Sequence, residues 1–296
     1  FLSPGKNNQS YNDPTVRTGI SPFAQLWLLS RRYWTLVNRD RLSLIFCLIA
    51  GPITIALTAL CLQEETILVK DNPPSLVQAS LALRLLFIFS CISIWIGLSN
   101  SIREIVKESA VYFRERLLNL GLFSYVFSKI AVRGAIAFGQ TLLITVAVMV
   151  NFEAPRSSLI PWFIGFAITT LLTLLASTSL SLMLSAYIKT ENEGNGILPL
   201  IIIPQIVFSG VLFELDGWSS RISWLMLSRW SIGAYGALAN INSMESNIPG
   251  SEAIFQPSPA YESTWSNLSL NWGMLGVHIF AYLFFTVILQ KRKDIF

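Results

Sequence analysis

The sequence predicts an all-α integral membrane protein with six transmembrane helices, preceded by an amphipathic helix and with re-entrant helices before the last span. Hydrophobic residues make up 53% of the 296-residue chain and charged residues 13%, whereas a soluble domain carries about a quarter charged residues. A spanning helix needs roughly 20 apolar residues and satisfies its own backbone hydrogen bonds. Six stretches meet that length: residues 42–62, 75–100, 122–150, 159–187, 197–213 and 271–289.

The N-terminal region predicts a linker followed by a surface helix. Residues 1–19 are polar and rich in Gly, Pro and Asn, so we expect a linker from a preceding domain. Residues 20–41 predict an amphipathic helix along the inner membrane surface, with Ser21 as its cap and Pro22 at its first position. The alternative is a basic flank that only sets topology. The predicted membrane-facing side holds Phe23, Leu26, Trp27, Ser30, Trp34 and Val37.

The distribution of basic residues predicts that both termini are cytoplasmic. With this orientation, sixteen of the 21 lysine and arginine residues lie on the side of the termini and four on the other side, which is the bias of the positive-inside rule. The net charge of +4 therefore indicates topology, and we expect no nucleic-acid partner. Arg84 falls within the second predicted span, where snorkelling or pairing with Glu214 would accommodate its charge.

The last long loop, residues 214–271, is predicted to be exterior and to have two parts. Residues 214–242 are too apolar for a solvated loop and too interrupted for a span, so we expect one or two re-entrant helices there. The remainder is polar and rich in Pro and Ser, which is typical of a surface loop. It contains a match to the N-glycosylation sequon at Asn267.

The chain lacks recognisable catalytic motifs. It contains no phosphate-binding loop, no dinucleotide fingerprint, no HExxH and no GxSxG. Cys47, Cys61 and Cys91 all fall in predicted spans, so neither a disulfide framework nor zinc spacing is indicated. His278 stands alone in an apolar span and is more typical of a packed residue than of a ligand. We therefore predict no catalytic site in this chain, and transport that is powered elsewhere is the leading hypothesis.

Residues 101–120 form a charged segment between two predicted spans. Glu108 and Glu115 are seven residues apart, so they project from one side of a helix about two turns apart. Such a polar protrusion suits the transmission of force to the membrane helices, and we call residues 101–120 the coupling segment. The alternative is a solvated loop that obeys the positive-inside rule.

Three stretches together resemble the G subfamily of ABC exporters, the White and multidrug-resistance half transporters. Glu108-x6-Glu115 followed by Gly121 and "LFSYVFSK" resembles the junction of the second and third spans in that subfamily. "FAQLWLLSRRYWTLVNRD", residues 23–40, is similar to its connecting helix. "FSGVLFELDGW", residues 208–218, is similar to the end of its fifth span and the following re-entrant helices. The resemblance covers the chain from Ser21 onward.

The resemblance implies roles for particular residues. It places Glu108, Phe113, Glu115 and Arg116 at the coupling interface with a nucleotide-binding domain. It places Ser93 and Ile96 of the second span, and Ile203 and Ile206 of the fifth span, along the substrate pathway. Val211 and Leu212 follow the FSG motif and correspond to an apolar gate, with Val where the subfamily has Leu. An aliphatic Ile96 stands at the position of the subfamily's aromatic clamp.

The implied function is that of the permease half of an ATP-driven exporter working as a dimer with a second permease copy. ATP and Mg would be bound by a nucleotide-binding domain, N-terminal on the same polypeptide, and not by this segment, so ATPase activity is expected only with that domain. A pathway lined by Ser, Ile and Val favours a lipid-like or amphipathic substrate. The absence of cysteine from the predicted exterior loop favours a bacterial member in the inner membrane. The alternatives are a permease for lipid-linked polysaccharide and a non-transporting membrane anchor or sensor.

Overall fold

The computed structural model describes residues 21–62, 66–70, 77–117, 120–157, 159–244 and 255–293. Within these ranges the chain forms helices and irregular connections without strands, so the predicted all-α class is confirmed. Five helices of the described ranges are long and apolar enough to cross a membrane. These spans contain α2 (Arg41–Leu62), α3 (Gln78–Ser101), α5 (Leu122–Asn151), α6 (Trp162–Tyr187) and α10 (Trp265–Lys293). The predicted linker at residues 1–19 lies outside the described residues.

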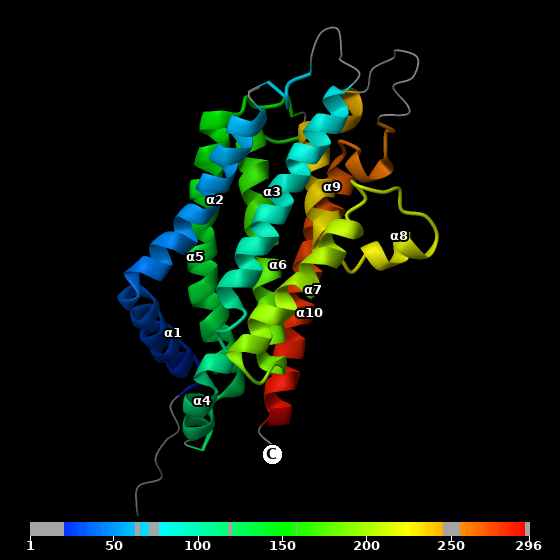
Figure 1. The fold of residues 1–296 in the computed structure, drawn as a ribbon. Coiled ribbons are helices and arrows are strands. Elements are labelled where there is room, and N and C mark those ends of the chain that lie inside the picture. Colours follow the sequence, from blue (N-terminus) through cyan, green and yellow to red (C-terminus); the bar gives the residue numbers. More distant parts are fainter. Residues whose placement is uncertain are drawn as a thin grey trace, which may run out of the picture.

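Helix α6 lies at the centre of the bundle and packs against α3, α5 and α10 (Figure 1). Small and hydroxyl side chains make these contacts close, as is common between membrane helices. The Ser181 hydroxyl donates to the Leu98 carbonyl oxygen of α3 at 2.6 Å. The Trp272 indole of α10 donates to the Thr169 hydroxyl at 2.9 Å. The side chains of α3 and α6 are mostly buried, whereas α2 and α10 bury few of theirs.

The first helix, α1 (Pro22–Arg39), lies at one end of the bundle beside α5 (Figure 1). The Ser21 hydroxyl accepts from the Ala24 amide at 3.3 Å, so the predicted cap is present. On the predicted membrane-facing side, Phe23, Trp27 and Trp34 are exposed, and Phe23 is 83% accessible; Leu26, Ser30 and Val37 are half-buried. Leu29 and Tyr33, which the prediction did not place on that side, are the buried residues of α1. The helix thus has two apolar surfaces, one packed on the bundle and one open.

Helix α7 (Glu191–Val207) occupies the region of the fifth predicted span but is shorter. It has 17 residues, or about 25 Å at 1.5 Å per residue, less than the roughly 30 Å hydrocarbon core. It ends at Val207 because residues 208–217 turn away, with Gly210 at a φ of 80°. The described residues therefore contain five full-length spans, and the prediction of six is not confirmed.

The predicted re-entrant region contains α8 (Trp218–Ser223), α9 (Leu227–Ala239) and the short 3-10 helices η2 (Ile241–Met244) and η4 (Pro259–Tyr261). Helix α9 packs against α3, α6 and α10, and all its residues except Arg229 are buried. Its apolar composition is thus explained by burial in protein. Helix α8 projects from the side of the bundle (Figure 1). Entry of these helices into the membrane stays a prediction, and residues 245–254 of this loop lie outside the described residues.

Asn267, the predicted sequon residue, lies in the first turn of α10 and is half-buried. Its amide nitrogen donates to the Ala260 carbonyl oxygen at 3.0 Å and to the Glu262 carbonyl oxygen at 2.9 Å. These bonds fix the preceding loop onto the helix. The structure therefore gives Asn267 a structural role.

The two ends of the bundle differ in character. The α4 end is the end at which α1, α4 (Ser109–Arg116) and the last turn of α10 lie (Figure 1). The α9 end is the opposite one, where α8, α9 and η4 lie. The start of α1 and the finish of α10 are thus at the same end of the bundle.

We predict that Gly97→Ala destabilises the bundle because there is no room for a Cβ atom between α3 and α6. A Cβ at Gly97 would clash with the Ser177 hydroxyl and lie 2.9 Å from the Leu174 carbonyl oxygen. Overpacking of this kind costs about 1–3 kcal/mol. Thermal unfolding in detergent should show a lower transition temperature. Gly273→Ala is the matched control, because nothing lies within 4 Å of its Cβ position. Equal transitions for the two variants would contradict the close packing.

Candidate functional site

A cluster of charged side chains joins α1, the coupling segment and α5 at the α4 end. We call this group the charge cluster. Its members are Tyr33, Glu104, Lys107, Glu108, Lys129 and Arg133. A cavity of about 580 Å³ adjoins it and is also lined by Asp40, Arg103 and Glu191.

Glu104 is the centre of the charge cluster and is 3% exposed. One carboxylate oxygen accepts from the Lys107 ammonium at 2.6 Å and from the Arg133 guanidinium of α5. The other oxygen accepts from the Tyr33 hydroxyl of α1. A buried carboxylate is tolerated only when it is paired and hydrogen-bonded in this way. One side chain thus connects three segments that are far apart in the sequence.

The backbone turn that carries Glu104 is held by α6. Helix α3 ends at Ser101, and η1 (Val106–Glu108) begins after a short turn. The Ser185 hydroxyl of α6 accepts from the amides of Ile105 and Val106 at 2.9 Å and 3.2 Å. Because these amides face the protein interior, the hydroxyl supplies the partner that a buried amide requires. The backbone of the turn is therefore bound to α6 independently of the side chains of the charge cluster.

Tyr33 connects α1 to α5 through its hydroxyl and its ring. The Arg133 Nε donates to the Tyr33 hydroxyl at 2.8 Å. The Lys129 ammonium lies 3.8 Å from the centroid of the Tyr33 ring, a cation–π contact, and pairs with Glu108. Burial raises the pKa of the Tyr33 phenol well above its usual value, and the neighbouring Glu104 carboxylate raises it further. The hydroxyl thus stays protonated and available as a donor at neutral pH.

A second set of contacts ties α1 to the coupling segment and to the start of α5. Arg32 forms an ion pair with Glu115, and this hydrogen bond is the main cause of the raised pKa of Arg32. The Gln25 side-chain oxygen accepts from the Gly121 amide at 3.0 Å. A Cβ at position 121 would lie 2.9 Å from that oxygen, so glycine permits the approach. Helix α1 is thus held along its length.

The structure places the four predicted coupling residues at the α4 end. Glu108 pairs with Lys129, and Glu115 pairs with Arg32. Arg116 donates to the Leu120 carbonyl oxygen at 2.5 Å and closes the turn after α4. Phe113 is exposed on α4. The two glutamates therefore contact different segments, α5 and α1.

The four predicted pathway residues do not line the cavities at the α4 end and the α9 end. Ser93 and Ile96 of α3 are buried, and the Ser93 hydroxyl donates to the Phe89 carbonyl oxygen at 2.9 Å. Ile203 of α7 is exposed, and Ile206 is half-buried. Their role as a pathway stays a prediction.

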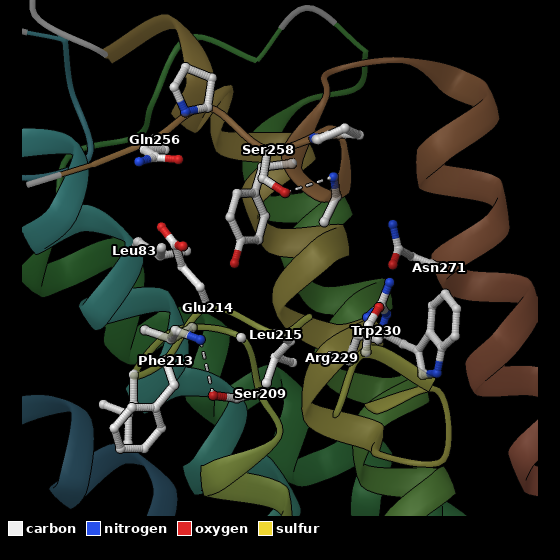
Figure 2. A pocket seen from close by; sticks show the side chains of 18 of the residues that line it. Leu83, Ser209, Phe213, Glu214, Leu215, Arg229, Trp230, Gln256, Ser258 and Asn271 are labelled. Carbon is white, nitrogen blue, oxygen red and sulfur yellow. Dashed lines mark hydrogen bonds between the residues drawn. The ribbon is translucent and has the colours of Figure 1, made fainter. Parts of the chain in front are cut away.

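The two predicted gate residues line a cavity at the α9 end. Its volume is about 730 Å³, and its lining includes Val211 and Leu212. Figure 2 shows this cavity between the segment after α7, the start of α9 and the loop before α10. Val211 packs partly against the main hydrophobic core, whereas Leu212 is exposed. No group of three His, Cys, Asp or Glu side chains within the described ranges is arranged to hold a metal ion.

Comparison with known proteins decides the family. The family described as "ABC-2 type transporter" matches residues 24–239, which extend from α1 to the end of α9. The chain belongs to the ABC-2 type transporters. It is also 25% identical over 189 residues to the "ABC transporter ATP-binding/permease protein Rv1747" of Mycobacterium tuberculosis. That match covers 61% of this chain and 20% of the relative, so the chain spans about a fifth of the relative's length.

The family assignment identifies this ABC-2 chain as a transporter permease of the membrane, with several apolar helices. Sequence reasoning had found Glu108 and Glu115 but had missed Glu104, Tyr33 and the role of Arg133. One signal was available, because Lys129 and Arg133 are four residues apart and so lie on one face of a helix. Two cations on one face of an apolar helix require an acid from elsewhere. The identity of that acid depends on the fold.

We predict that Glu104→Gln strongly destabilises this ABC-2 permease because it leaves Arg133 and Lys107 without their shared carboxylate. Removing one partner of a buried ion pair costs about 3–5 kcal/mol. Thermal unfolding in detergent should therefore show a large decrease in the transition temperature. Glu115→Gln is the control, because its pair with Arg32 is partly exposed and such pairs contribute about 1 kcal/mol or less. A smaller loss for Glu104→Gln than for Glu115→Gln would contradict the central role of Glu104.

Proposed function

We propose that this ABC-2 permease is the membrane half of an ATP-driven exporter, of the G-subfamily type, that moves a lipid-like or amphipathic substrate. The observation that carries the proposal is the charge cluster, which joins α1, the coupling segment and α5 through Glu104. A permease that binds no nucleotide has to receive force at a polar and rigid junction. The charge cluster is a junction of that kind.

The force would come from a nucleotide-binding domain that contacts α4. Helix α4 exposes Phe113, and Leu117 after it is 86% accessible, which leaves an apolar contact for a partner. The name of the M. tuberculosis relative combines ATP-binding and permease functions in one protein, which supports a nucleotide-binding domain on the same polypeptide. We place that domain N-terminal to this segment because of the polar linker expected at residues 1–19. That domain would bind ATP and Mg and hydrolyse the nucleotide. The residues of this chain would supply the contact and transmit the movement.

Movement would pass from α4 to the membrane helices through α1. A displacement of α4 shifts Glu115 and hence Arg32 of α1. Tyr33, in the next position of α1, then acts on Arg133 of α5 and on Glu104 at the end of α3. Because these contacts are short and directional, the three helices respond together. Rocking of α1 would thus change the angle between α3 and α5 at the α4 end.

A second permease copy would pack on the exposed side of α7. Leu200 and Ile203 of this helix are exposed, as are Leu212 and Phe213 beyond its end. Ile203 and Ile206 of α7 would then face the pathway between the two copies, and Ser93 and Ile96 would contribute to it from α3. Val211 and Leu212 would close the pathway toward the α9 end. The aliphatic character of these residues supports an apolar substrate more than a polysaccharide.

The charge distribution supports a bacterial inner membrane with cytoplasmic termini. The α4 end carries the basic last turn of α10, with Lys291, Arg292 and Lys293. Most other lysine and arginine residues are on the same predicted side. By the positive-inside rule, this end would be cytoplasmic, and the α9 end would then be exterior.

A charge exchange between α1 and α4 tests the transmission. We predict that Arg32→Glu and Glu115→Arg each lower lipid-stimulated ATP hydrolysis, because each leaves two like charges in contact, and that the double variant recovers it. A coupling energy of about 1 kcal/mol, typical of contacting residues, corresponds to a factor of about five. The measurement is ATP turnover of the full native polypeptide in lipid nanodiscs. Turnover unchanged in all three variants would indicate a membrane anchor or sensor in place of a transporter.

The gate is tested by shortening Leu212. We predict that Leu212→Ala increases the ATP-dependent translocation of a fluorescent lipid analogue in proteoliposomes, because a smaller side chain leaves a wider opening. Leu225→Ala is the matched control, since Leu225 is also exposed and does not belong to the proposed gate. Similar rates for both variants and the unmodified protein would remove Leu212 from the gate.

A further inference from the structure

The cavity at the α9 end has a composition that the proposed gate does not explain. Its lining combines aromatic residues and an arginine with apolar residues at its margin. Figure 2 shows Ser209, Phe213 and Glu214 on one side of it, and Arg229 with Asn271 on the other. A volume of about 730 Å³ is in the range of cavities that bind small ligands. The cavity is therefore large enough for the head of a lipid.

Arg229 is the member of α9 that remains accessible when all other residues of this helix are buried. Its guanidinium donates to the Ser223 hydroxyl and lies 5.8 Å from the Trp224 ring and 5.5 Å from the Trp230 ring. Within the part of the chain that the structure describes, no carboxylate forms an ion pair with Arg229. A guanidinium has five N–H donors, so a single bond to Ser223 leaves capacity for a ligand.

The position of Arg229 is fixed by the residues around it. The Gln205 side-chain oxygen of α7 accepts from the Ser228 amide at 3.1 Å, and the Ser228 hydroxyl donates to the Gln205 carbonyl oxygen at 2.5 Å. The first turn of α9 is thus bound to α7 directly before Arg229. The Trp230 indole donates to the Trp224 carbonyl oxygen at 2.9 Å, and this bond fixes the orientation of the Trp230 ring beside Arg229. A cation held in place in this way loses little freedom when it binds an anion.

The acidic residues of the cavity are less desolvated than Arg229. Glu214 and Asp216 line the cavity, and both are exposed, whereas Arg229 is half-buried. Water and salt screen exposed charges more strongly than partly buried ones. Arg229 is therefore the least screened charge of the cavity lining. The two carboxylates of the lining disfavour a ligand with several negative charges, so a head with a single phosphodiester charge fits best.

The margin of the cavity is suited to an acyl chain. Leu212, Phe213 and Leu270 line the cavity and are each at least half accessible. Apolar area of this kind gains about 25 cal/mol per Å² when a chain covers it. A ligand with a polar head and an apolar tail would therefore satisfy both parts of the site. A free phosphate ion would use only Arg229.

We propose that this cavity binds the phosphodiester head of an amphiphile, with Arg229 pairing the phosphate and the tail lying over Leu212, Phe213 and Leu270. Guanidinium groups bind phosphate oxygens through two parallel hydrogen bonds. Trp224 and Trp230 flank the guanidinium and offer apolar surface beside it. The bound amphiphile would belong to the class of substrate that the permease releases at the α9 end, so this assignment rests on the proposed export function.

Binding is measured without ATP, on the full native polypeptide in neutral detergent, by isothermal titration calorimetry. The probe is dihexanoyl-phosphatidylglycerol, a soluble phosphodiester lipid, and dihexanoylglycerol is the same molecule without the phosphate head. We expect the phosphodiester lipid to bind at least about tenfold more tightly, since a hydrogen bond to a charged group contributes about 1.5–3 kcal/mol. Equal affinities would overturn the proposal. Displacement of the lipid by inorganic phosphate at an equal concentration would show a phosphate site and would overturn the amphiphile assignment.

Arginine variants locate the binding. We expect Arg229→Gln to weaken binding of the phosphodiester lipid about tenfold or more, and Arg229→Lys to weaken it less because the charge is kept. Arg221→Gln is the matched control, because Arg221 is also stacked on a tryptophan, 4.9 Å from the Trp218 ring, but does not line the cavity. Thermal unfolding identifies variants that fold. Equal losses in Arg221→Gln and Arg229→Gln would overturn the assignment.

The binding experiment and the charge-exchange experiment can fail separately. If the arginine variants leave lipid binding unchanged while the charge exchange at Arg32 and Glu115 behaves as expected, the cavity assignment fails and the export proposal stands. If lipid binding depends on Arg229 but ATP turnover ignores the charge exchange, the site stands as a lipid site of a non-transporting protein.

Discussion

The fold at the α4 end depends on one buried carboxylate. Glu104 is almost fully buried, yet it accepts hydrogen bonds from side chains of α1, η1 and α5. A carboxylate without these partners would carry a desolvation cost of several kcal/mol, so its burial requires all three segments to be in place. Conversely, Arg133 and Lys107 would each lose an anion without it. The mutual requirement makes this region a single unit.

This mutual requirement also explains how a helix outside the bundle is tied to it, as the proposed transmission of force requires. Helix α1 buries only Leu29 and Tyr33, which is little apolar area for 18 residues. Its orientation is also fixed by polar contacts of Gln25, Arg32 and Tyr33. Polar contacts are directional and weaken steeply over a small displacement. A shift of α1 would therefore break individual hydrogen bonds and ion pairs. This property suits the role in force transmission that we propose for α1.

The interior of the bundle has the opposite character. Helices α3 and α6 approach closely at Gly97 and Ser177, and α9 is enclosed by α3, α6 and α10. By contrast, α7 exposes Leu200 and Ile203 and ends early. The close-packed helices and the exposed helix α7 are joined at Gln205 of α7, which binds the first turn of α9. Changes on the open side of α7 are thereby connected to Arg229 at the α9 end.

The sequence by itself determined the fold class, the approximate places of the membrane helices and the presence of a charged segment, residues 101–120, between two of them. These follow from composition, hydropathy and short-range charge spacing, which act within a single helix. Glu115 and Glu108 were found in this way, as was the cap at Ser21.

Only the tertiary structure decided the partners. Glu104 and Tyr33 are 71 positions apart, and no periodicity connects an acid at the end of α3 to a phenol on α1. The burial of Ser93 and Ile96 likewise depends on neighbouring helices. The apolar pattern of residues 214–242 gave no means to distinguish lipid contact from protein contact, and the enclosure of α9 by α3, α6 and α10 supplied the answer. The physical reason is that burial and ion pairing are properties of groups brought together in space, whereas the sequence records only their order along the chain.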